Sequence, residues 1–286
     1  MEELTTFLTS IGEEVEDAEE GMFPQHSHHT FYSIRSPRTK KTPVLWKITP
    51  LFAEWITTQS NPFWTTTILT PTSTVLELGC GISGLIALAL SPKITHYIAT
   101  DQEYVHRLLR SNLETNAPSQ HPRSKAGSHR KPSKHGPNNN KTAQKPTPNI
   151  TFTTLDWETD DPALLKDSIA NNDGNTGRED RGFDVLISCD CIYNEALIAP
   201  FVRTCADVCR LRAVYGAEKE LGEGEMRPTV CVIAQQQRSP EVFEAWLRET
   251  MRVFRVWRVG DEVLGGKLAS GSGYLVHVLV LKDGDL

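Results

Sequence analysis

The sequence contains no hydrophobic run near the roughly 20 residues that a membrane-spanning helix needs. Its first residues, M-E-E-L-T-T-F-L, are acidic and lack the basic start of a secretory signal. These two absences exclude an integral membrane protein and a secreted one. The sequence therefore predicts a soluble protein of the cytoplasm, and of the nucleus as a second location, with no membrane partner.

Paired cysteine motifs are also missing. The six cysteines are scattered and form no C-x-x-C pair, so we expect buried free thiols of a reducing compartment rather than zinc ligands or disulfides. Three histidines, His26, His28 and His29, lie close together, but no cysteine or carboxylate accompanies them. A metal site is therefore not predicted, there or elsewhere.

Charge is distributed unevenly along the 286 residues, whose formal net charge is −6. Residues 2–20 hold eight acidic and no basic side chains, whereas residues 117–148 hold seven basic and no acidic ones. Residues 117–148 also lack large apolar side chains, and both stretches read as solvated segments. We predict a disordered acidic arm at 1–30, and one domain at 31–286 that carries a disordered basic insertion at 117–148.

The most informative stretch is Val75 to Gly84, V-L-E-L-G-C-G-I-S-G. Strand-forming residues lead directly into glycines spaced G-x-G-x-x-G, of which Gly79 and Gly81 come first, and a helical pattern follows. Glycine permits a sharp turn and lets a ligand approach where a Cβ would block it. The strand before the glycines and the helix after them strengthen the prediction of a ligand-binding turn around Cys80.

Glu77 indicates which ligand this turn binds. In a dinucleotide-binding fold the turn receives a pyrophosphate, which a carboxylate at this position would repel. S-adenosylmethionine carries a sulfonium and an ammonium, and its charge suits that carboxylate. E-L-G-C-G-I-S-G resembles the first motif of the class I S-adenosylmethionine-dependent methyltransferases, so this cofactor is favoured over a nicotinamide or flavin.

Two later segments fit the same cofactor. Asp101 ends a strand 22 residues after Gly79, where a βαβ unit places the acidic residue that binds both ribose hydroxyls; N-capping of the next helix is the alternative. Asp156 and Trp157 follow a strand at 150–154 and suit an adenine, through a carboxylate acceptor and a stacking face. Trp46 is either an aromatic wall of the cofactor site or a core residue.

Strands and helices alternate along the chain. This pattern predicts an α/β fold: a Rossmann-like, doubly wound, mostly parallel methyltransferase sheet of seven strands with an antiparallel terminal hairpin. Besides the strand that begins at Val75, the expected strands are 94–100, 150–154, 183–188, 229–234, 253–259 and 274–281.

Four landmarks carry a family resemblance: Trp46, the glycine turn, L-D-W at 155–157 and D-C-I-Y at 190–193. Together they resemble the seven-strand protein-lysine methyltransferases called methyltransferase family 16, over residues 44 to 281. N-P-F-W at 61–64 and T-D-Q at 100–102 resemble the fungal ribosomal lysine N-methyltransferase 5 branch. The resemblance implies methylation of a lysine in a ribosomal or other cytosolic protein.

The resemblance also implies site residues. Cofactor contacts are implied at Trp46, Gly79 to Gly81, Asp101, Trp157 and Cys189, although the family commonly has a small residue such as alanine at the position of Cys189. Asp190 is expected to hold the incoming ammonium, with N-capping as its alternative. Tyr193 is expected to supply an aromatic wall or a hydroxyl.

Other functions stay open. Methyltransferases of nucleic-acid bases usually carry Asn/Asp-Pro-Pro-Tyr/Phe, and D-C-I-Y lacks both prolines, which argues against a flipped base. The basic insertion could attract RNA but has no interleaved aromatics, so nucleic acid is not the expected partner. An RNA or small-molecule N-methyltransferase and a non-catalytic cofactor-binding interaction module remain alternatives. We expect a monomer.

Overall fold

A computed structural model describes residues 2–19, 46–116, 149–165, 182–212 and 227–282. Three features of the sequence lie outside these ranges: the histidines at 26–29, the basic insertion at 117–148, and residues 31–36, F-Y-S-I-R-S, whose alternation predicts an accessory strand. Within the described ranges, no helix combines the length and the apolar character that crossing a bilayer requires. All six cysteines are free, and Cys191 alone among them is not fully buried.

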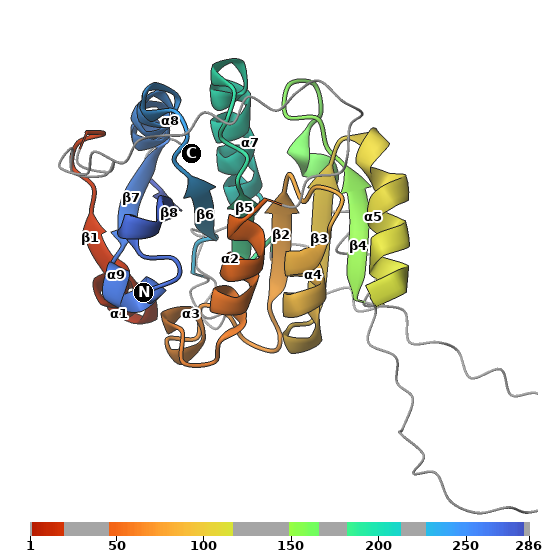
Figure 1. Ribbon diagram of the computed structural model, residues 1–286, viewed down its shortest axis with the longest axis horizontal. Coiled ribbons are helices and arrows are strands. Elements are labelled where there is room, and N and C mark those ends of the chain that lie inside the picture. Colours follow the sequence, from red (N-terminus) through yellow and green to blue (C-terminus); the bar gives the residue numbers. More distant parts are fainter. Residues whose placement is uncertain (1, 20–45, 117–148, 166–181, 213–226, 283–286) are drawn as a thin grey trace, which may run out of the picture.

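The centre of the structure is one twisted sheet of eight strands in the order β1-β7-β8-β6-β5-β2-β3-β4 (Figure 1). Strands β4, β3, β2, β5 and β6 run parallel to their neighbours, whereas β8, β7 and β1 add antiparallel strands at one side. The strands are β1 Gly12–Glu14, β2 Thr74–Leu78, β3 His96–Asp101, β4 Ile150–Thr154, β5 Val185–Cys189, β6 Val230–Gln236, β7 Phe254–Val259 and β8 Tyr274–Leu281.

Helices cover both faces of the sheet, and Figure 1 shows α2 and α4 in front of the strands. Strand residues alternate between the two faces: in β2, Val75 packs in the apolar cluster of α1, α2, α4 and α5, whereas Leu76 packs in the cluster of α7 and α8. The helices are α1 Glu2–Ile11, α2 Ile48–Thr57, α3 Pro62–Thr65, α4 Leu85–Leu90, α5 Glu103–Asn116, α7 Ile198–Arg210, α8 Pro240–Val253 and α9 Asp261–Leu264.

The predicted fold class is confirmed. The seven expected strands are present, and the last two form the antiparallel pair that the sequence predicted. The eighth strand, β1, was not expected, because its sequence G-E-E has neither apolar alternation nor β-branched residues.

The N-terminal segment differs from the disordered arm expected at 1–30. Residues 2–14 form α1 and β1, and β1 pairs with β7 at the edge of the sheet. Leu4, Phe7 and Ile11 lie on one side of α1 and are buried, and the Phe7 ring packs edge-on against Phe63 with centroids 4.7 Å apart. The acidic side chains of this segment occupy the solvent side of an amphipathic helix and strand, so their charge does not prevent folding.

Phe7→Ala tests whether the N-terminal helix is part of the folded core. Phe7 is 0% exposed, and removing a buried phenyl ring costs about 3–5 kcal/mol of unfolding free energy. Urea unfolding should show a loss of that size, while Glu16→Ala, at an exposed position of the same segment, should stay within about 0.5 kcal/mol of the unsubstituted protein. Equal, small effects would mean that α1 does not contribute to the core.

Candidate functional site

A cavity of about 720 Å³ opens at the carboxyl ends of β2, β3, β4 and β5, which lie at the upper end of the sheet in Figure 1. In open α/β sheets, ligands bind at this end, where the strand order reverses. All eleven residues expected in the site line this cavity: Trp46, Glu77, Gly79, Cys80, Gly81, Asp101, Asp156, Trp157, Cys189, Asp190 and Tyr193.

The glycine turn between β2 and α4 exposes backbone to the cavity. Gly79 and Gly81 both have positive φ, 69° and 61°. A Cβ on Gly79 would lie 2.5 Å from the Cys191 sulfur, whereas a Cβ on Gly81 would meet no protein atom within 4 Å. The space at Gly81 is therefore open to a ligand, and any side chain at Gly79 would collide with the floor of the site.

Glu77 is an almost fully buried carboxyl group on β2. The Tyr97 hydroxyl donates to its Oε2 at 2.7 Å. Burial raises the pKa of Glu77 to about 7; the Tyr97 hydrogen bond opposes the rise and the nearby Asp101 carboxylate adds to it. A cation placed in the cavity would favour the ionised form, so the charge of Glu77 is coupled to the charge of the ligand.

Asp101 ties the glycine turn to the end of β3. Its Oδ2 accepts from the Gly81 N–H at 2.8 Å, and its Oδ1 accepts from the Gln102 N–H at 2.7 Å. Burial raises the pKa of Asp101 in spite of these two donors. The carboxylate thus accepts these hydrogen bonds from residues outside α5, which argues against the N-capping alternative. Each of its oxygens keeps a lone pair for a donor of a ligand.

Asp156 and Trp157 form the wall contributed by β4. Asp156 accepts from the Gln102 amide and from the Glu158 N–H, both at 2.9 Å; the Glu158 N–H, and then the Gln102 amide, lower its pKa. The Trp157 ring packs edge-on against Phe201 with centroids 5.0 Å apart. Its indole N–H is buried and has no hydrogen-bond partner among the described residues, which leaves one donor available to a ligand.

A pair of thiols lies under the turn. The Cys189 Sγ is 3.8 Å from the Thr49 hydroxyl, and the Cys191 Sγ lies 3.6 Å from the carbonyl oxygens of Leu78 and Gly79. Burial raises the pKa of Cys191 to about 12 and raises that of Cys189 as well. Both thiols are neutral packing groups, and Cys191 was missed because its role depends on contact with a distant turn.

Asp190 is held more tightly than the sequence suggested. It adopts a positive φ of 63° directly after β5, a conformation that aspartate tolerates better than most residues. Its Oδ1 accepts from Arg238 Nη1 at 2.8 Å, from the Gln235 amide at 3.1 Å and from the Gln236 N–H at 3.3 Å. Its Oδ2 accepts from Arg238 Nη2, which completes a bidentate ion pair.

The N-capping alternative for Asp190 is wrong, because Asn194 caps the helical turn that follows and accepts from the Ala196 N–H at 3.2 Å. Sequence reasoning missed Arg238 altogether. It lies 48 positions further along the chain, between β6 and α8, and no local pattern connects it with Asp190.

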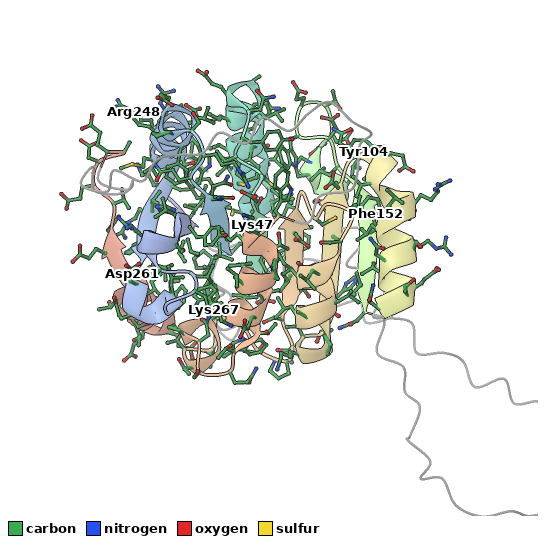
Figure 2. All side chains as sticks on the ribbon, viewed as in Figure 1. Lys47, Tyr104, Phe152, Arg248, Asp261 and Lys267 are labelled. Atoms are coloured by element: carbon green, nitrogen blue, oxygen red, sulfur yellow. The ribbon has the colours of Figure 1, made fainter. Side chains whose placement is uncertain are left out.

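Exposed aromatic side chains surround the cavity. Trp46, Tyr104 and Tyr193 all line it and are 44%, 79% and 62% exposed. Figure 2 shows Tyr104 at the upper end of α5, the end at which the parallel strands terminate. Partial burial raises the pKa of Tyr193. Trp46 is not a core residue, so the core-packing alternative is wrong; its ring faces the Arg238 guanidinium at 4.7 Å.

The charge of the lining decides which ligands fit. The described lining residues include five carboxyl groups, on Glu77, Asp101, Asp156, Glu158 and Asp190, and no lysine or arginine. Arg238 offsets the charge of Asp190, but the other carboxyl groups would repel a pyrophosphate, whereas a ligand with a positive centre would be stabilised. The charge of the described lining therefore favours a ligand that carries a positive centre.

Comparison with known proteins gives relatives of one main kind. No family model matches. The chain is similar in sequence to proteins named ribosomal lysine N-methyltransferase 5. The Zygosaccharomyces rouxii protein is 29% identical over 219 residues, which are 73% of this chain and 63% of that protein. The Candida glabrata protein is 30% identical over 187 residues, which are 56% of this chain and 53% of that protein.

A Schizosaccharomyces pombe protein named diaminohydroxyphosphoribosylamino-pyrimidine deaminase is 35% identical over 96 residues, which are 34% of this chain and 23% of that protein. This chain thus spans less than two thirds of each of these relatives. The resemblance to ribosomal lysine N-methyltransferase 5, expected from Trp46, the glycine turn, L-D-W and D-C-I-Y, is confirmed as a sequence similarity over most of the chain.

The raised pKa of Glu77 predicts a pH-dependent stability. The pKa of Glu77 in the folded protein, about 7, lies above the value of 4.5 for an unperturbed glutamate. Its stabilising contribution to the free energy of unfolding is therefore fully present below pH ~4.5 and is lost as the pH rises through ~7. At about 1.4 kcal/mol per unit, the loss is about 3 kcal/mol.

Urea unfolding at pH 5 and pH 8 tests this. Glu77→Gln, which keeps an acceptor for Tyr97, should show a smaller fall in unfolding free energy between the two pH values than the unsubstituted protein. The same fall in both proteins would show that Glu77 does not titrate in this range.

Proposed function

We propose that this chain is an S-adenosylmethionine-dependent protein-lysine N-methyltransferase whose substrate is a ribosomal protein. One observation carries the proposal: the cavity at the glycine turn is lined by five carboxyl groups and by no described lysine or arginine. That lining suits a nucleoside with a cationic side chain and a cationic acceptor. The name of the relatives, ribosomal lysine N-methyltransferase 5, adds that the acceptor is a lysine and that the substrate is ribosomal.

The residues present fit the cofactor. Asp101 would accept from the ribose hydroxyls, Asp156 and the Trp157 ring would bind the adenine, and the unpartnered Trp157 N–H offers a further donor. Glu77 would balance the positive charge. The open space at Gly81 leaves room for the ligand against the backbone. When bound, the sulfonium supplies the methyl group.

The acceptor side of the cavity would orient and deprotonate the lysine. A lysine with its usual pKa of about 10.4 has no free lone pair at neutral pH. Removal from water and the nearby sulfonium would both lower that pKa. Asp190 would hold the ammonium by hydrogen bonds until it loses its proton, and Tyr193 and Trp46 would enclose its alkyl chain.

The exposed aromatic residues support a protein as the partner. Trp46, Tyr104 and Tyr193 surround the opening, and exposed aromatic side chains are typical of protein-binding surfaces. Because one chain supplies every residue of the proposed site, we take the monomer as the active form. A ribosomal substrate favours action in the cytosol.

Deaminase activity, suggested by the name of the fission yeast relative, has no support in the residues of this chain. Zinc-dependent base deaminases bind their metal through a His and a C-x-x-C pair, and this sequence contains no C-x-x-C. Within the described residues, no cluster of three or more metal-ligating side chains occurs. The 96 aligned residues therefore do not carry that chemistry here.

Asp101→Ala tests the cofactor site. Hydrogen bonds to a charged group contribute about 1.5–3 kcal/mol each, so affinity for S-adenosylmethionine should fall roughly ten- to hundred-fold. Isothermal titration calorimetry measures the change. Glu103→Gln is the matched control, because Glu103 is an exposed acidic residue nearby that does not line the cavity; unchanged affinity in Asp101→Ala would remove the ribose role.

Methyl transfer is tested with labelled S-adenosylmethionine and a source-cell extract depleted of its own copy of the protein. We expect label in a protease-sensitive band of the ribosomal fraction. Asp190→Asn should leave that band unlabelled and still bind S-adenosylmethionine, because Asp190 acts on the acceptor. Label removed by ribonuclease would contradict a protein substrate, and cofactor binding without any label would favour an interaction module.

A further inference from the structure

Arg238 occupies a cation site formed by two residues of the cavity lining, Asp190 and Trp46. Its guanidinium bonds both oxygens of Asp190 and lies over the Trp46 ring, 4.7 Å from its centroid. Asp190 and Trp46 both line the cavity, whereas Arg238 does not. A carboxylate beside an aromatic face is the combination that binds ammonium and guanidinium groups.

We infer that Arg238 is a resident cation in the acceptor site, and that an incoming substrate lysine must displace it from Asp190 and Trp46. This inference rests on the proposed function, because it takes Asp190 as the group that receives the acceptor. Oδ1 of Asp190 already accepts from three donors and its side chain is 0% exposed. Asp190 therefore has no room for a second cation while Arg238 is in place.

The contacts of Arg238 allow it to leave. Its side chain is 35% exposed, and its further hydrogen bond within the described residues goes to the half-buried Gln236 side chain at 3.1 Å. The contacts that position Asp190 do not depend on it: the Gln235 amide and the Gln236 N–H donate to Oδ1, and the Asp190 N–H donates to the Ala234 carbonyl at 2.8 Å. When Arg238 swings out, the carboxylate stays fixed for the substrate.

The displacement has a consequence for specificity. A neutral side chain has no charge to replace that of Arg238, and a short side chain does not reach Asp190. Either one would leave the buried carboxylate of Asp190 unpaired. Only a cation long enough to pass the exposed aromatic residues could compensate. Arg238 thereby makes access to the site conditional on the charge and the length of the acceptor.

The first test needs no cofactor. Arg238→Ala empties the site, so n-butylammonium should bind there and raise the melting temperature of the variant in a concentration-dependent way. The unsubstituted protein should respond at least tenfold more weakly, n-butanol should have no effect, and Arg238→Ala/Asp190→Asn should lose the response. If Arg238→Ala does not fold, Arg238→Gln replaces it. Equal responses in the variant and the unsubstituted protein would overturn the inference.

The second test asks whether the site is where methyl transfer occurs. In Arg238→Lys the substituted amine lies in the acceptor position, so the protein should methylate itself when S-adenosylmethionine is added. The amine nitrogen forms a bond to the methyl carbon, the carbon–sulfur bond breaks with its electron pair on sulfur, S-adenosylhomocysteine is released and the ammonium proton goes to solvent. Mass spectrometry of the intact chain and its peptides should find the methyl group at position 238.

Arg248→Lys is the matched control. Arg248 also pairs with a carboxylate, that of Glu244, but it lies on the exposed face of α8 (Figure 2) and should acquire no methyl group. If Arg238→Lys stays unmodified while the unsubstituted protein labels its extract substrate, the inference falls and the proposed function stands. If the extract shows no label at all, the proposed function falls, and the n-butylammonium test still decides whether Arg238 fills a cation site.

Discussion

The position of β2 between β3 and β5 places the glycine turn between Asp101 and Asp190. From the end of β2 the chain turns at Gly79 and Gly81, and the strands on its two sides then end in Asp101 and in the segment that holds Asp190. The reversal of strand order leaves a crevice there that no crossover helix fills. The hydrogen bond from Gly81 to Asp101 closes one side of this crevice, and the thiol of Cys191 supports the turn from below.

Two buried carboxyl groups at this crevice are stabilised in opposite ways. Glu77 has the Tyr97 hydroxyl as a partner and no nearby cation among the described residues, and burial raises its pKa to about 7. Asp190 instead has a guanidinium and two amide donors. The first group can change its protonation when a positively charged ligand arrives, whereas the second needs a cation at all times. The crevice therefore combines a carboxyl group whose charge can respond to a ligand with a carboxylate that is already paired with a guanidinium.

Local patterns in the sequence predicted most of the fold and eleven residues of the cavity lining, but not Gln102 or Glu158, which also line it. Glycine spacing, the distance to Asp101 and the continuous apolar strand before Asp190 are local signals. Arg238 and Cys191 were missed because their roles arise from contacts between segments far apart in sequence. The helix α1 was missed for another reason: its buried residues at positions 4, 7 and 11 have helical spacing, but the surrounding acidic residues outweighed that pattern.

The edge strand β1 also has a consequence for the order in which the protein folds. β1 hydrogen-bonds to β7, and these two strands are separated by about 240 residues of chain. Because β1 precedes β7 in the chain, it has no partner on the ribosome until most of the sheet's other strands have been made. Glu13 and Glu14 of β1 are exposed, and charged side chains on an edge strand disfavour pairing with the strands of other chains.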